Sequence, residues 1–117
     1  MIVKGEDTIR EVAGLSQEER ERISAFLQGA VYCWCKNRKE EWFSMLELMG
    51  GDNNDWTGTP LQMLHDKEIE NGKSKEEAYD NAGKNSGWLL KKVIFDDKRR
   101  FETEETPINR RYRWLLD

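Results

Sequence analysis

The 117-residue chain has only two cysteines, one histidine and no long apolar run. Cys33 and Cys35 point to different sides of a helix at this spacing, so we expect free thiols rather than a disulfide. His65 has no other ligand spaced to complete a set of three or four, so we expect no metal and no cofactor. No stretch approaches the roughly 20 apolar residues of a membrane-spanning helix, so we expect no membrane segment.

The short motifs of common enzymes are absent as well. The chain contains no GxxxxGK[ST] phosphate loop, no GxGxxG dinucleotide motif, no GxSxG elbow and no HExxH zinc motif. Both cysteines fall inside a predicted core helix, which is unlike the site of an activated thiolate. We therefore do not expect an enzyme. Residues 1–6 lack the apolar segment of a secretory signal, so we expect a cytoplasmic protein.

Charged and aromatic residues are abundant: 36% of the residues are charged and five are tryptophan. Such a chain is too aromatic for a disordered protein and long enough for one compact domain, residues 1–117. The net charge is −4, yet residues 84–113 hold nine basic and five acidic side chains. This asymmetry is typical of a nucleic-acid-binding face, and a solvated surface of mixed charge is the alternative.

The strongest helix signal begins at Ser16, which has the spacing of a capping box with Glu19. Apolar residues then recur at intervals of three and four, which indicates one continuous stripe on the helix. We interpret the stripe as core, and a dimer seam is the alternative. It comprises Ile23, Phe26, Leu27, Ala30, Val31 and Trp34, of which Phe26, Leu27, Val31 and Trp34 should be nearly fully buried.

Shorter elements follow from similar local signals. Capping residues predict a short helix from Ser44 to Met49 and a second helix from Thr59 to Glu70. Residues 2–3 and 41–43 are interpreted as short strands. Between the two helices, the Asp- and Asn-rich segment 50–58 fits an EF-hand loop at Gly58, but Leu64 stands where that loop needs Glu. We therefore predict Asx turns there instead of a calcium site. Trp56 is expected to pack on the core, and an exposed anchor for a partner is the alternative.

The last third of the chain, from Ser74, predicts two short helices and a hairpin. Ser74 begins a helix to about Asn81, Ala82-Gly83 is read as its stop, and Ser86 as the cap of a second helix. The second helix carries an apolar arc formed by Leu89, Leu90, Val93 and Ile94. Two alternating runs, Phe101 with Thr103 and Tyr112 with Trp114, flank a proline-containing turn and predict a β-hairpin.

A helix, a short turn, a helix and a hairpin in this order resemble a winged helix-turn-helix domain, over about 43 residues. The resemblance implies that the second helix enters the major groove of DNA and that the hairpin contacts the backbone. The chain departs from the pattern of this family at Glu102–Glu105, an acidic run at the wing tip that would repel phosphate. The residues that it assigns to nucleic acid are Lys84, Asn85, Ser86, Lys91 and Lys92 on the helix, and Arg99, Arg100, Arg110, Arg111 and Arg113 on the wing.

We therefore expect a single-domain, mostly α, winged-helix-like bundle with a small C-terminal hairpin, helical over 16–83 and helix plus hairpin over 84–116. The leading functional hypothesis is regulatory binding of duplex DNA. The alternative is a non-enzymatic interaction module for a protein partner or a second copy, by analogy with small accessory proteins of bacteria and mobile elements. Exposed hairpin arginines would favour DNA, whereas arginines paired with Glu102, Glu104 and Glu105 would leave little free positive charge.

Overall fold

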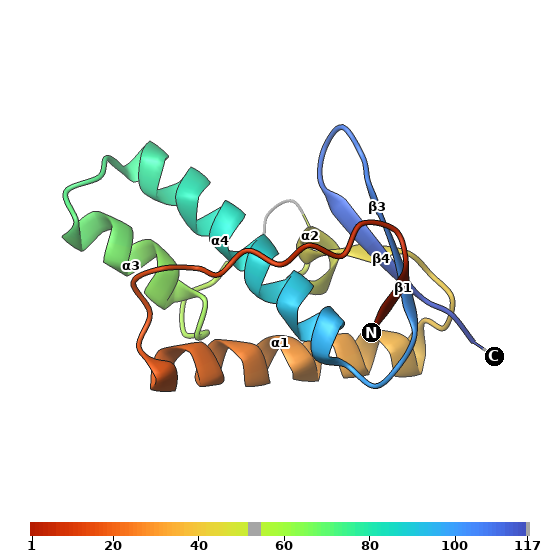
Figure 1. Cartoon of the computed structure of the whole chain (residues 1–117). Helices are drawn as coiled ribbons and strands as arrows, with labels where there is room; N and C mark the ends of the chain where they lie inside the picture. The colour runs from red at the N-terminus through yellow and green to blue at the C-terminus, as the bar shows by residue number, and fades with distance from the viewer. Residues whose placement is uncertain (52–54, 117) are drawn as a thin grey trace.

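The computed structural model describes residues 1–51 and 55–116, which form helices packed on one face of a mixed sheet (Figure 1). About half of the chain is helical, and the described residues form one compact domain. The helices are α1 (Gln17–Asn37), α2 (Met45–Leu48), α3 (Gln62–Glu70) and α4 (Lys75–Asp96), and the strands are β1 (Ile2–Lys4), β2 (Phe43–Ser44), β3 (Phe101–Glu105) and β4 (Arg110–Trp114).

The predicted hairpin is confirmed, but it is part of a larger sheet. The strand order is β1-β3-β4-β2, with β1 parallel to β3 and the other pairs antiparallel. Tyr112 lies opposite Thr103 on one side and Phe43 on the other. Both predicted short strands are present, the first at Ile2–Lys4 and the second at Phe43–Ser44, which overlaps the predicted range 41–43 only at Phe43. The predicted hairpin is therefore the centre of a four-stranded mixed sheet, because strands from the beginning and middle of the chain extend it on both sides.

Helix α1 begins as predicted. The Ser16 hydroxyl accepts from the Glu19 N–H at 3.1 Å, and the Glu19 carboxylate accepts from the Ser16 N–H at 2.8 Å. The fully buried line of α1 is Ile23, Leu27, Val31 and Cys35, which recur every four residues. Phe26 and Trp34 flank this line and are only half-buried against the edge of the core, so the prediction of their full burial is wrong.

Helix α4 is one continuous helix of 22 residues, so the predicted stop at Ala82-Gly83 and the second start at Ser86 are wrong. The boundary between the predicted helical part, 16–83, and the predicted helix-plus-hairpin part, 84–116, therefore falls inside α4 of the single domain. Ala82 and Ser86 are buried, and the Ser86 hydroxyl donates to the Gly83 carbonyl at 2.7 Å instead of capping a new helix. Small residues on this face let α3 pack closely against the first half of α4. The chain turns between these two helices at residues 71–74, where Gly72 has a φ of 85°.

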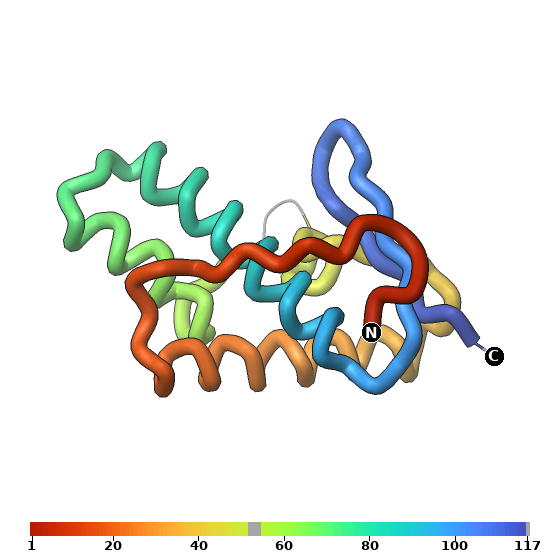
Figure 2. The backbone as a smooth tube through the Cα atoms, in the orientation of Figure 1, coloured from red at the N-terminus to blue at the C-terminus, as the bar shows by residue number. Residues whose placement is uncertain are grey.

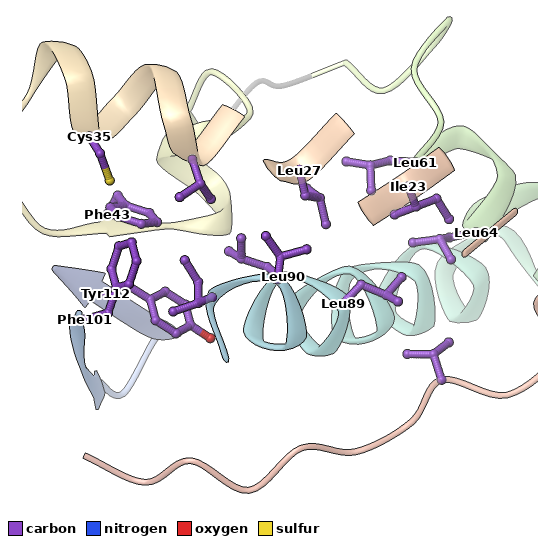
Figure 3. Close-up of a cluster of buried hydrophobic side chains, with 14 of the residues drawn as sticks. Ile23, Leu27, Cys35, Phe43, Leu61, Leu64, Leu89, Leu90, Phe101 and Tyr112 are labelled. Carbon is purple, nitrogen blue, oxygen red and sulfur yellow. The ribbon is translucent and has the colours of Figure 1, made fainter. Parts of the chain in front are cut away.

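The core extends along α4 and joins the helical end to the sheet (Figure 3). At one end, Leu61 and Leu64 lie close to Ile23 and Leu89. At the other end, Phe43 packs against Phe101 and Tyr112, with ring centroids 6.4 and 5.9 Å apart. Leu90 lies between the two groups. The helices and the inner face of the sheet therefore share one hydrophobic core.

The segment between β1 and α1 crosses α4 in an extended conformation (Figure 2). Val12 in this segment is buried in the core, and the Arg20 guanidinium donates to the Val12 carbonyl at 2.9 Å. The beginning of the segment is fixed by Gly5, where an added Cβ would come within 2.1 Å of the Thr103 carbonyl oxygen. We call residues 5–15 the strap.

Among the described residues, no helix is long and apolar enough to span a bilayer.

Replacing Gly83 by alanine tests whether α4 is continuous. Gly83 has ordinary helical geometry, and an added Cβ would meet no atom within 4 Å. Gly83→Ala should therefore raise the free energy of unfolding by about 0.5–1 kcal/mol, the usual difference between these residues inside a helix. Urea denaturation measures the change. Gly72→Ala is the matched control and should destabilise, since its φ is positive. A loss of stability for Gly83→Ala would indicate a helix end there.

Candidate functional site

The predicted nucleic-acid contacts on α4 do not form one exposed face. Ser86 is buried, and the Lys91 side chain is only 2% exposed, so the expectation that these two residues face solvent is wrong. The Lys91 Nζ lies 2.7 Å from the Glu6 Oε2 of the strap and 5.4 Å from the centre of the Trp88 ring. Lys91 is buried because the strap and the hairpin cover the side of α4 on which it lies.

The other α4 positions differ in exposure. Lys84 is exposed and Asn85 is half-buried beside α3. Lys92 is exposed, but its Nζ lies 3.0 Å from the Asp96 carboxylate one turn further along the helix. Arg100, before β3, is also exposed, and its carbonyl accepts from the Leu115 N–H at 2.8 Å. Their binding to nucleic acid stays a prediction.

Arg99 forms a two-pronged ion pair with Asp97 just after α4. Its Nη2 and Nε donate to the two carboxylate oxygens at 2.7 and 3.0 Å, and Gln28 of α1 donates to the same carboxylate at 2.8 Å. Burial alone would raise the pKa of Asp97, but the hydrogen bonds from Arg99 and Gln28 outweigh burial and lower it to about 2. The Asp97 carboxylate therefore ties the end of α4 to α1 through Gln28, and Arg99 neutralises its charge.

The hairpin arginines are paired across the strands. Arg111 binds Glu104 and Arg113 binds Glu102, each with an Nε–Oε1 distance of 2.6 Å. These partners lie directly opposite each other in the register of β3 and β4. Both guanidinium groups also make cation–π contacts with one ring, because the guanidinium carbons of Arg111 and Arg113 lie 4.4 and 4.9 Å from the centre of the Trp42 ring. Two of the three β4 arginines are therefore neutralised on the outer face of the sheet.

Arg110 points to the other side of the hairpin, toward the strap and α4. Its Nη2 lies 3.7 Å from Glu6 and 3.8 Å from Glu105, and its Nη1 donates to the Thr103 hydroxyl at 3.2 Å. Lys91 and Arg110 thus meet at the same carboxylate although they come from different elements. The Lys91 hydrogen bond is the main cause that lowers the pKa of Glu6 to about 2.

An open apolar cleft lies between α2, the first half of α4 and the hairpin turn. Its volume is about 750 Å³. Ile108 at the turn is 86% exposed and Tyr79 on α4 is 71% exposed. The floor of the cleft is formed in part by Ala82 and Gly83 of α4. The remaining lining residues are Met45, Leu46, Met49, Asp55, Trp56, Gln62, His65, Ser86 and Asn109.

Local sequence signals build both walls of this cleft. The Glu47 carboxylate accepts from the Ser44 N–H at 3.0 Å, so α2 begins directly after β2. Met45 in α2 and Met49 just after it then line the cleft. On the other wall, Thr106 closes the hairpin turn, since its N–H donates to the Asn109 carbonyl at 2.8 Å. Ile108 lies inside that turn and has no place in the core.

A second hollow of about 600 Å³ continues the cleft toward the strap. The two hollows share Met45, Gly83, Ile108 and Asn109 as lining residues. We call the second hollow the basic end of the cleft, because three cations line it. Its charged lining residues are Glu6, Lys84, Lys91, Glu105 and Arg110.

Trp56 packs against the core as predicted, and it also lines the apolar cleft. Its indole Nε1 is buried and has no hydrogen-bond partner among the described residues. Asp55 forms the expected Asx turn, since its carboxylate accepts from the Thr57 N–H at 2.8 Å. The other residues of the rejected calcium loop, Asp52, Asn53 and Asn54, lie outside the described residues.

The cysteines and the histidine do not form a reactive cluster in the described part of the chain. Cys33 is exposed, Cys35 is buried and both are free, as their spacing predicted. Burial raises the pKa of the Cys35 thiol to about 11, which keeps it protonated. His65 is half-buried, 4.0 Å from Asp66. Within residues 1–51 and 55–116, no three His, Cys, Asp or Glu side chains could together hold a metal ion.

Apart from Trp56, sequence reasoning missed the cleft residues, and it missed the role of Glu6. Two signals pointed to the cleft: an isoleucine inside a polar turn, and a tyrosine among polar neighbours at the start of α4. No sequence signal relates Glu6 to Lys91, which lie 85 positions apart. Comparison with protein-family models, curated proteins and solved structures finds no match to this chain.

The Asp97–Arg99 pair predicts how stability changes with pH. The pKa of Asp97 is lowered from 3.8 to about 2, which corresponds to about 2 kcal/mol of stability above pH 4. This stabilisation should disappear as the pH falls through 2, when the folded carboxylate is protonated. Urea denaturation at about pH 5 and about pH 2 should show a smaller loss for Asp97→Asn than for the natural chain. Equal losses in both proteins would contradict this assignment.

Binding to duplex DNA remains a prediction, and its salt dependence tests it. Each phosphate contact contributes about 0.9 to the slope of log K against log salt. Arg111→Ala and Lys92→Ala should each make that negative slope shallower by about one. Neither substitution should change the sequence preference. Both cations are paired in the free chain, so each must exchange a carboxylate for a phosphate. Lys39→Ala, just after the end of α1, is the control and should leave the slope unchanged. No mobility shift of duplex DNA at low salt would refute the prediction.

Proposed function

We propose that this protein is an interaction module that binds a short, apolar segment of a partner protein in the cleft between α2, α4 and the hairpin turn. The observation that carries the proposal is the pair of large apolar side chains at its rim, Ile108 and Tyr79, which are 86% and 71% exposed. Covering an exposed isoleucine side chain is worth about 1.5–3 kcal/mol. A partner that covers both residues would gain this free energy.

The composition of the cleft also suits a protein partner. Met45 and Met49 line it, and methionine side chains adapt to irregular surfaces. Polar side chains, including Gln62, His65 and Asn109, also line the cleft. Apolar side chains interspersed with polar groups are typical of the surfaces at which proteins associate.

The pairing of the hairpin arginines supports a protein partner over DNA. Arg111 and Arg113 face carboxylates directly across the strands, and Glu102 is only 7% exposed. Binding phosphate there requires breaking these pairs, whereas binding in the cleft leaves them intact. The order of α4 and hairpin, with β2 beside β4, supports a winged-helix-like arrangement as part of the proposal. Two free cysteines suit a reducing compartment, which supports a cytoplasmic location.

Selection from a displayed library of random peptides tests the proposal. Peptides selected on the natural chain should carry large apolar side chains. Their affinity should fall by about tenfold or more, or about 1.4 kcal/mol, on Ile108→Asp, because that substitution places a carboxylate in the apolar rim. Fluorescence anisotropy with a labelled peptide measures the change.

Ile69→Asp is the matched control, since Ile69 is 40% exposed on α3 and does not line the cleft. It should leave peptide affinity unchanged. Equal losses for both substitutions, or none for Ile108→Asp, would overturn the proposal. Analytical ultracentrifugation of the natural chain and of Ile108→Asp adds a second readout. A dimer that is lost only in Ile108→Asp would show that a second copy, rather than another protein, covers the cleft.

A further inference from the structure

We propose that Lys91 and Arg110 form a carboxylate-binding subsite at the basic end of the cleft, where an acidic side chain of the partner displaces the chain's own Glu6. The inference rests on the proposed function, because the subsite is continuous with the apolar cleft. It adds a chemical requirement on the partner, namely an aspartate or glutamate beside its apolar side chains.

The two cations are held in place by contacts that do not involve Glu6. Lys91 is buried within α4, and its Nζ lies 5.4 Å from the centre of the Trp88 ring, at the distance of a cation–π contact. Arg110 is fixed from the other side by its hydrogen bond to the Thr103 hydroxyl at 3.2 Å. The subsite is therefore preorganised, and an incoming carboxylate meets positive charges already in position.

Glu6 occupies this subsite as a replaceable ligand. Its carboxylate lies 2.7 Å from the Lys91 Nζ and 3.7 Å from the Arg110 Nη2, yet its side chain is 51% exposed. Gly5 packs directly against the Thr103 backbone, and Val12 anchors the far end of the strap in the core. Rotation of the Glu6 side chain into solvent breaks its hydrogen bond from the Thr8 N–H and frees the subsite, while both anchors of the strap stay in place.

The charges of the basic end favour such an exchange. With Glu6 turned away, Lys84, Lys91 and Arg110 face Glu105 as the remaining acidic side chain of this lining. Because Lys91 loses a close ion pair when Glu6 turns away, the vacated subsite favours another anion that restores the pair. The hydrogen-bond geometry that Glu6 uses is available to any carboxylate that reaches the same position.

A small acid that reaches only the subsite tests the inference separately from the apolar cleft. Acetyl-glutamate amide is titrated into the full chain, and NMR follows the side-chain signals of Lys91 and Arg110. A tethered competitor has an effective concentration on the order of millimolar, so Glu6→Gln should bind the acid about tenfold more tightly than the natural chain. Glu6→Gln combined with Lys91→Met should lose this binding.

Glu11→Gln is the matched control, because Glu11 is another exposed acid of the strap that pairs with Arg20 instead. It should bind the acid as weakly as the natural chain does. Equal binding by the natural chain and Glu6→Gln, no binding by Glu6→Gln, or binding that survives Lys91→Met would each overturn the inference. Tighter binding of inorganic phosphate than of the acid by Glu6→Gln would also overturn it, in favour of a phosphate ligand.

The apolar cleft can fail its own test while this one succeeds. Library peptides that bind the cleft without an acidic residue, together with no binding of the small acid, would refute only the subsite. Binding of the small acid together with peptides insensitive to Ile108→Asp would refute only the apolar cleft.

Discussion

The buried face of α4 is the surface on which the other elements of this protein are assembled. Its first half carries Ala78 and Ala82, which are small enough for α3 to pack closely, and its second half carries Leu90 and Ile94, which join the core beneath the sheet. Burial of this long face stabilises the helix across Gly83, a residue that by itself weakens helices. The strap, α1 and the sheet all reach the core through contacts along the same helix.

Most cations near α4 and the hairpin are matched by carboxylates that folding brings close. Arg111 and Arg113 meet their partners through strand register, whereas Lys91 and Arg99 rely on contacts beyond the hairpin. Aromatic rings add to this arrangement, because Trp42 lies against two guanidinium groups. The local excess of basic residues is therefore largely neutralised at the surface, and the apolar cleft becomes the more distinctive feature of the molecule.

In the proposed function, the cleft and its basic end combine two kinds of recognition in two adjoining hollows. Ile108 and Tyr79 offer apolar surface that is not used in folding, while Lys91 and Arg110 offer charge that the chain itself satisfies with Glu6. A hydrophobic contact supplies free energy roughly in proportion to the area covered, whereas a paired charge mainly adds discrimination between partners. In the proposed complex, the apolar contacts supply affinity and the carboxylate exchange supplies selectivity.

The sequence alone determined the local elements: the caps at Ser16 and Ser74 and the hairpin around its proline turn, because each depends on residues a few positions apart. Local signals failed at Gly83, where glycine suggested a helix end. Only the tertiary structure decided that α4 continues, that β1 lies beside β3, and that Glu6 reaches Lys91. These outcomes depend on packing between segments tens of residues apart, and the free energy of that packing exceeds the small local preferences that a sequence pattern reports.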